Sequence, residues 1–166
     1  MSDQTPFLRH TLATLAYRLE KVLRDPPADF AGYYVGADVR TPLLILAHIG
    51  DLLELSVRLA EGEHAWSTGP SLTWEDERER VFAALARLDA RLVAAPPARP
   101  AEQIFQGPIA DALTHVGQLA MLRRLAGQPV RAESYARAKI AVGKVGPEQS
   151  TERVEFDYDA SGRRRS

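Results

Sequence analysis

Two side chains that commonly bind metal ions occur at helical spacing in one stretch of the sequence. Asp111 and His115 lie four residues apart within QGPIADALTHVGQLAMLRRLAG, residues 106–127, so a helix would place them one turn apart on one face. The same stripe continues through Gln118 to Leu122, and it is polar in its first half and apolar in its second. A carboxylate and an imidazole on a stripe that should face a core indicate a functional site.

A second histidine occupies an apolar position in another predicted helix. His48 stands in the stripe that residues 41–61 should bury, where a leucine would be expected. Two imidazoles and one carboxylate leave open positions on a divalent cation, and this set suits zinc, nickel, manganese or ferrous iron. An ion held in this way lowers the pKa of a bound water or thiol, or polarises a substrate oxygen.

A purely structural interpretation of the same residues is also open. His48 and His115 could be hydrogen-bonded core histidines, with Asp111 favoured by the dipole near the start of its helix. Gln118 could orient a ligand or a bound water, or it could satisfy a backbone carbonyl at a helix contact. His10 and His64 are expected at the surface rather than in a site.

Four amphipathic segments with Pro- and Gly-rich connections are expected to position these side chains. We expect helices from about residue 6 to 25, 41 to 61, 73 to 94 and 108 to 126, with a short helix over 131–141 and an edge strand over 153–158. The sequence therefore predicts an all-α fold, a four-helix bundle with a short extra C-terminal helix. The bundle is expected to occupy residues 1–145, and residues 146–166 a loosely ordered, flexible tail.

For some charged and aromatic side chains the sequence predicts an ordinary structural role. Asp51 and Glu54 flank the apolar stripe of their helix and should be solvated, as should the pair Arg123–Arg124. Several aromatic residues could line a pocket mouth or simply pack in the core, namely Tyr33, Tyr34, Trp66 and Trp74.

Composition narrows the classes of function. The chain has 166 residues, a net charge of -1 and no cysteine, so disulfides, thiolate ligands and a cysteine nucleophile are excluded. Neutral charge and the lack of a basic helix face disfavour a nucleic-acid binder. No apolar run approaches the ~20 residues that cross a bilayer, and we expect neither a secretion signal nor a membrane partner. These features fit a cytoplasmic protein.

The stretches that carry the site resemble the DinB/YfiT superfamily of bacterial four-helix bundles. The resemblance covers residues 7–149 and is carried by Arg40-Thr41-Pro42 through Ala47-His48-Ile49 and by Thr114-His115-Val116-Gly117-Gln118-Leu119. In that family a histidine on the second helix joins a His-x-x-x-His pair on a later helix to form a metal site. His48 and His115 match two of those positions, and Asp111 replaces the remaining histidine.

The resemblance implies a divalent-metal-dependent transferase or isomerase that uses a low-molecular-weight thiol, such as bacillithiol, mycothiol or glutathione, on a small-molecule electrophile. It also implies a homodimer, for which Ile49 and Leu53 are a possible seam. Because this chain has no cysteine, any thiolate must come from a cosubstrate. The alternative is a non-catalytic stress-response or binding module that keeps the bundle with a degenerate metal site, which the aspartate at position 111 would favour.

Overall fold

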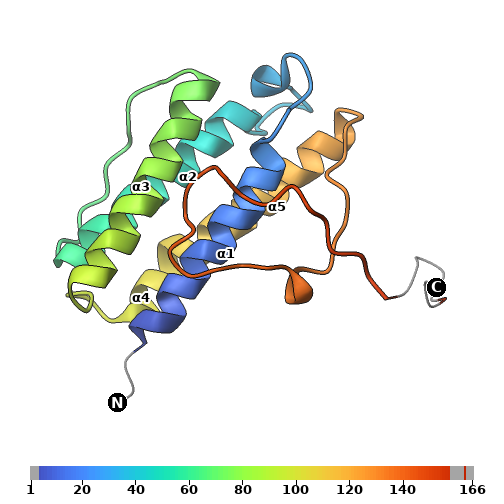
Figure 1. Ribbon diagram of the computed structural model, residues 1–166. Coiled ribbons are helices and arrows are strands. Elements are labelled where there is room, and N and C mark those ends of the chain that lie inside the picture. Colours follow the sequence, from blue (N-terminus) through green and yellow to red (C-terminus); the bar gives the residue numbers. More distant parts are fainter. Residues whose placement is uncertain (1–3, 158–162, 164–166) are drawn as a thin grey trace.

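The computed structural model describes residues 4–157 and residue 163, and in this part of the chain it is helical without β-strands. Four long helices dominate the fold (Figure 1). The elements in chain order are α1 (Thr5–Leu23), the 3-10 turn η1 (Phe30–Gly32), α2 (Pro42–Glu61), α3 (Trp74–Ala94), α4 (Ala101–Ile104), the π-helical segment η2 (Phe105–Ile109), α5 (Ala110–Leu125) and the 3-10 turn η3 (Tyr135–Arg137). The prediction of an all-α fold is confirmed for these residues.

Local sequence signals set the ends of α2 and α3. The Thr41 side chain accepts a hydrogen bond from the backbone N–H of Leu44, and Pro42 follows it at the first helical position. Gly62 ends α2 at φ 100°, a left-handed conformation that costs glycine little. Thr73 caps α3 in the same way as Thr41 caps α2. These boundaries agree with the sequence prediction because a cap depends only on its neighbours in the chain.

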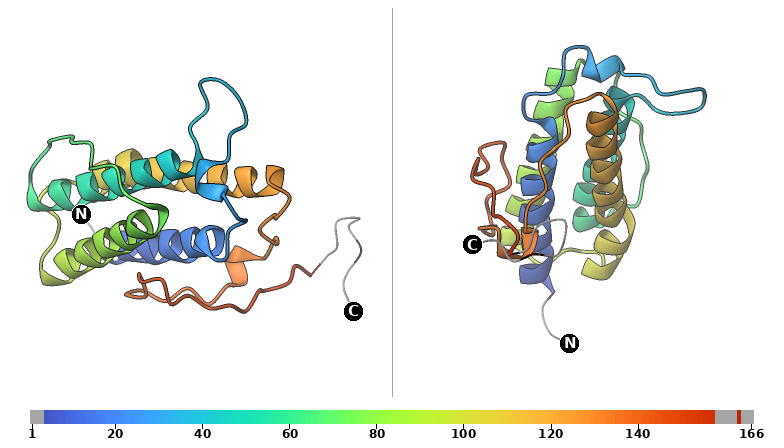
Figure 2. Two further views of the ribbon diagram at one scale, coloured as in Figure 1. Left: turned by 90° about the horizontal axis from the view of Figure 1, so that it is seen from above. Right: turned by 90° about the vertical axis from the view of Figure 1, so that its right-hand side faces the viewer.

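Each long helix packs between two others. α2 contacts α3 and α5, and α1 contacts the same two helices, so α1 and α3 form one layer and α2 and α5 the other (Figure 2). The core between the layers is mainly leucine, with valine, isoleucine and alanine. Ile49 and Leu53 belong to it, with no exposed surface. The expectation that they form a dimer seam is therefore wrong, because that face of α2 is already covered within the chain.

The chain kinks at Gly107, and α5 begins just beyond this kink, as the Gly-Pro pair predicts. Gly107 and Pro108 lie inside η2, where the backbone of Gly107 leaves helical geometry at φ -89° and ψ -105°. Proline removes a backbone donor and crowds the preceding turn, which fits a break between two helices at this point. Asp111 follows at once, in the first turn of α5.

Residues 127–157, which we call the C-terminal strap, run beside α1 on the side away from α2 and α5 (Figures 1 and 2). The short helix predicted over 131–141 is only the three-residue turn η3, because Tyr135 reaches α1 from an extended chain and packs edge-on against Tyr17 at 6.4 Å. The predicted strand over 153–157 is irregular chain, and position 158 lies outside the described residues.

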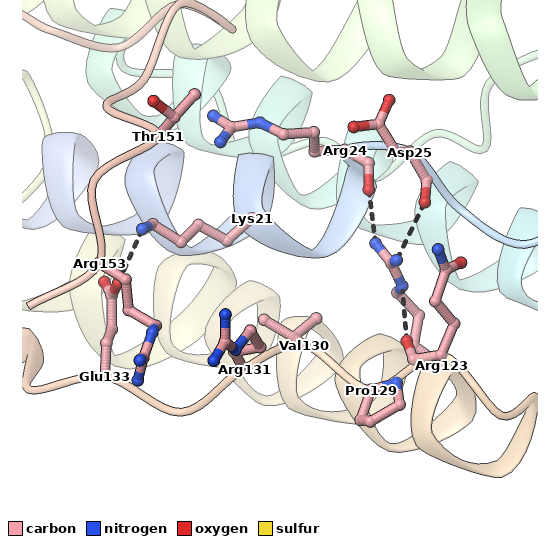
Figure 3. Close-up of a pocket in the computed structure, with 11 residues that line it drawn as sticks. Lys21, Arg24, Asp25, Arg123, Pro129, Val130, Arg131, Glu133, Thr151 and Arg153 are labelled. Carbon is pink, nitrogen blue, oxygen red and sulfur yellow. Dashed lines mark hydrogen bonds and ion pairs between the residues drawn. The ribbon is translucent and has the colours of Figure 1, made fainter. Parts of the chain in front are cut away.

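Ion pairs and carbonyl contacts fasten the strap to α1. Lys21 donates to the buried carboxylate of Glu133 at 2.7 Å, and Arg24 donates to the carbonyl of Gln149 at 3.2 Å. Figure 3 shows the first of these contacts in the pocket between α1 and the strap. Gln149 is itself 8% exposed. The beginning of the predicted tail therefore packs against the helices.

Arg123 joins the end of α5 to the end of α1. Its guanidinium donates to the carbonyl oxygens of Val22, Arg24 and Asp25 at 2.9, 2.6 and 3.0 Å, as Figure 3 shows for the last two. These are carbonyls at the negative end of α1, which have no partner within the helix. Arg123 is only 5% exposed, so the expectation that it is solvated is wrong.

Candidate metal centre

The structure brings His48, Asp111 and His115 together. The Nε2 atom of His48 lies 3.7 Å from Asp111 Oδ2, and Nε2 of His115 lies 3.4 Å from Asp111 Oδ1. One potential ligand atom from each residue falls within 4.8 Å of the other two. Two helices that are separate in the sequence, α2 and α5, therefore present one compact group of donors.

Helical spacing explains the placement on each side. Asp111 and His115 are four residues apart on α5, so their side chains stack on one face. His48 lies on the stripe of α2 that includes Ile45 and Leu52, which are 3% and 5% exposed. Burial of the apolar residues turns both stripes toward the core. Because α2 packs against α5, His48 then lies beside Asp111 and His115.

The three side chains differ in exposure, and this difference gives the site a direction. The side chain of Asp111 is 48% exposed, that of His48 22% and that of His115 10%. The pKa of His48 is lowered from its ordinary value, first by burial and then by the neighbouring His115 and Arg40, while Asp111 opposes the shift. A lowered pKa keeps the imidazole neutral near pH 7, which is the form that binds a metal.

Gln118 contacts His115 at Nδ1, the ring nitrogen that does not face Asp111. Its Oε1 atom lies 2.7 Å from Nδ1 of His115, so with the amide oxygen facing the ring, Nδ1 donates the hydrogen bond. That tautomer leaves the lone pair of Nε2 directed at Asp111 and His48. Gln118 thus touches the imidazole rather than the centre of the group, and it fixes the orientation that a ligand needs.

The loop between α2 and α3 covers the other histidine. The ring of Trp66, half exposed, lies 5.7 Å from the ring of His48. Of the remaining aromatics, Trp74 is buried against Phe30 at 5.7 Å, so it belongs to the core. His10 and His64 are exposed, as expected.

Asp51 anchors this loop, one turn beyond His48 on α2. Its Oδ1 atom accepts hydrogen bonds from the backbone N–H of Gly69 at 2.9 Å and from Arg80 at 3.0 Å. Arg80 also donates to Glu77 and, at 2.7 Å, to the carbonyl of Ala47 beside His48. Asp51 is 5% exposed, so the expectation that it is solvated is wrong; a cation from α3 compensates its burial.

Two grooves flank the three donors. The larger, about 970 Å³, includes Asp111 and Thr114 and is floored by leucines of α2. The smaller, about 470 Å³, includes His115, Gln118 and Arg40. The group therefore lies in the wall between two openings, with its most exposed member in the larger one.

The donor set fits a divalent cation. Ligand atoms about 2.0–2.2 Å from a tetrahedral ion lie roughly 3.3–3.6 Å apart. His115 Nε2 lies 3.4 Å from Asp111 Oδ1, which matches this value, and His48 Nε2 lies 3.7 Å from the other carboxylate oxygen, Oδ2, which is slightly wide. With one donor atom taken from each residue, the separations are at most 4.8 Å, so the side chains must move closer together for all three to bind one ion.

Sequence reasoning found the three donors from their spacing. It missed charged residues that lie near the donors only in the folded structure. Arg40, which lowers the pKa of His48, stands in the Arg-Thr-Pro stretch and precedes the α2 cap. Arg80 lies on α3 with no pattern linking it to α2. Only proximity in space shows these contributions.

No protein-family model, no curated protein and no solved structure matches the chain. The DinB/YfiT resemblance therefore stays a prediction. Within residues 4–157 and at 163, no helix combines the length and apolar content that crossing a membrane requires.

Proposed function

We propose that this chain is a DinB-like metalloprotein, a divalent-metal-dependent transferase or isomerase that joins a low-molecular-weight thiol to a small electrophile or rearranges such an adduct. The observation that carries the proposal is the convergence of His48, Asp111 and His115, whose donor atoms lie within 4.8 Å of one another. The motif resemblance supplies the class of reaction, and it also leads us to infer a cytoplasmic homodimer.

Each residue of the site has a role in this proposal. His48, Asp111 and His115 would hold the cation, and Gln118 would keep His115 in the tautomer that binds it. A divalent cation there supplies Lewis acidity, which lowers the pKa of a thiol that it binds. The thiol comes from a cosubstrate, because the chain contains no cysteine.

The surroundings of the site favour such chemistry. The half-exposed ring of Trp66 covers one side of His48 and limits water there, while the larger groove leaves Asp111 accessible to a small molecule. Partial exclusion of water strengthens electrostatic interactions within a site. The site is thus sheltered by the protein on one face and open to substrate on the other.

The proposal is tested by metal content and thiol transfer together. Protein purified without chelators should contain a divalent metal, and Asp111→Ala should contain much less. The zinc-loaded wild type should accelerate addition of glutathione, mycothiol or bacillithiol to an electrophilic dye, with Asp111→Ala close to the uncatalysed rate. Equal metal content in both proteins would refute the proposal.

A second candidate is a binding or stress-response module whose site no longer holds metal. The Gln118 contact satisfies one nitrogen of His115 without any ion, which favours this alternative. A ligand that binds only the native state must raise the melting temperature. A melting temperature unchanged by saturating zinc or nickel would therefore support the module and exclude the enzyme.

A further inference from the structure

We propose that the larger groove binds a substrate with three parts: a head that coordinates the metal, an apolar middle and a carboxylate end bound by Arg99. This inference rests on the proposed function and names the class of molecule that the site takes. It concerns leucines of α2 and residues on the α2–α3 and α3–α4 connections, none of which belongs to the donor set.

The direction of the donor atoms shows which groove the substrate uses. In an imidazole, Nδ1 and Nε2 lie on different sides of the ring. Gln118 binds Nδ1 of His115 and lines the smaller groove, whereas Nε2 points toward Asp111, which lines the larger groove. A cation between the Nε2 atoms is therefore reached from the larger groove. The smaller groove lies on the Nδ1 side of His115, where Gln118 is bound.

The walls of the larger groove determine what fits beside the metal. Its floor consists of Leu52, Leu55 and Leu59, which follow one another along a single face of α2. Leu52 and Leu59 are only 5% and 6% exposed, so a ligand would bury apolar surface mainly on the partly exposed Leu55, at roughly 25 cal/mol per Å². An extended apolar segment of a ligand would therefore lie along α2, leading away from Asp111.

Arg99 and His64 line the far end of the groove, both are exposed, and neither has a hydrogen bond or an ion pair with another described residue. Arg99 is the one arginine that lines this groove, and Asp111, the one carboxylate, lies at its metal end, so the charge offered at the far end is that of Arg99. The planar fork of an arginine matches a carboxylate with two parallel hydrogen bonds.

The test uses two families of hydroxamic acids as probes, since the hydroxamate head binds zinc. Each family has an unbranched alkyl chain of graded length, and one family ends in a methyl group while the other ends in a carboxylate. Isothermal titration into zinc-loaded protein measures both affinities at each length. We expect the carboxylate to bind about threefold to fivefold more tightly at the matching length, and Arg99→Gln to abolish that preference.

Arg40→Gln is the matched control, because Arg40 lines the smaller groove. It should leave the carboxylate preference unchanged. Loss of the preference in Arg40→Gln but not in Arg99→Gln would overturn the inference, and so would the absence of a preference at every length. If zinc binds but no preference exists, only this inference fails. If zinc does not bind, the proposed function fails with it.

Discussion

Replacing Asp51 by asparagine removes the charge of a buried carboxylate while keeping its shape. In the native protein Asp51 accepts hydrogen bonds from Gly69 and Arg80 at 2.9 and 3.0 Å, and its side chain is 6% exposed. An asparagine can still accept from Gly69, but the ion pair with Arg80 is lost. Glu77 remains bound to Arg80 at 2.8 Å, so the arginine is not left without a carboxylate.

These contacts set the magnitude. A hydrogen bond to a charged group contributes about 1.5–3 kcal/mol, so Asp51→Asn should lower the free energy of unfolding by about that amount. Asp51→Ala loses both contacts and should cost about 3–5 kcal/mol, the range for breaking a buried ion pair. Asp51→Ala, which removes the acceptor of the Gly69 N–H, should also loosen the loop that carries Trp66 and increase its cleavage by proteases, whereas Asp51→Asn, which keeps an acceptor, should not.

Urea unfolding followed by circular dichroism measures the first effect, and limited proteolysis of residues 62–73 measures the second. Glu54→Gln is the control, because Glu54 pairs with Arg87 near the surface, where the arginine side chain is 55% exposed. It should cost less than about 1 kcal/mol. The reasoning is refuted if Asp51→Asn unfolds like wild type, or if Glu54→Gln is equally destabilised.

Two further predictions concern a glycine and a histidine. Gly50→Ala should lower the free energy of unfolding by about 1–3 kcal/mol, because the new Cβ would lie 2.5 Å from Cζ of Arg80. Gly117→Ala has open space around its new Cβ and should raise the free energy of unfolding by roughly 0.5–1 kcal/mol. Equal effects of the two substitutions in urea unfolding would contradict this prediction. In metal-free protein the pKa of His48 should lie below 6.5 and fall further in Asp111→Asn, since the carboxylate favours the imidazolium. The unfolded chain then binds more protons below pH 6.5, so the free energy of unfolding should fall as pH drops there; an NMR pKa above 6.5 would refute it.

The sequence predicts the helices and the three donors because both depend on short-range spacing. Thr41 with Pro42 defines the start of α2 through bonds to its own first turn. The four-residue step from Asp111 to His115 guarantees that they share a face of any helix. His48 joins them only if α2 packs against α5, which the structure shows; the apolar stripes require burial but do not select the partner helix.

Charged residues whose partners are distant in the chain were beyond local reasoning. Arg123 binds carbonyls about 100 residues away at the end of α1, and Asp51 pairs with Arg80 from another helix. A charged residue beside an apolar stripe looks solvated unless the facing helix is known to supply a counter-ion. The same limit applies to the C-terminal strap. It has no regular helical pattern, and it is held by contacts with Lys21, which is far away in the sequence.

The central claim is that an ion, rather than packing alone, explains why His48, Asp111 and His115 point at one another. Isothermal titration of zinc into chelator-free protein tests it most directly, with His115→Ala compared against His10→Ala, which alters an exposed histidine outside the group. Our account predicts saturable binding of one ion per chain in wild type and His10→Ala, and its loss in His115→Ala. Identical isotherms for His115→Ala and wild type would contradict it.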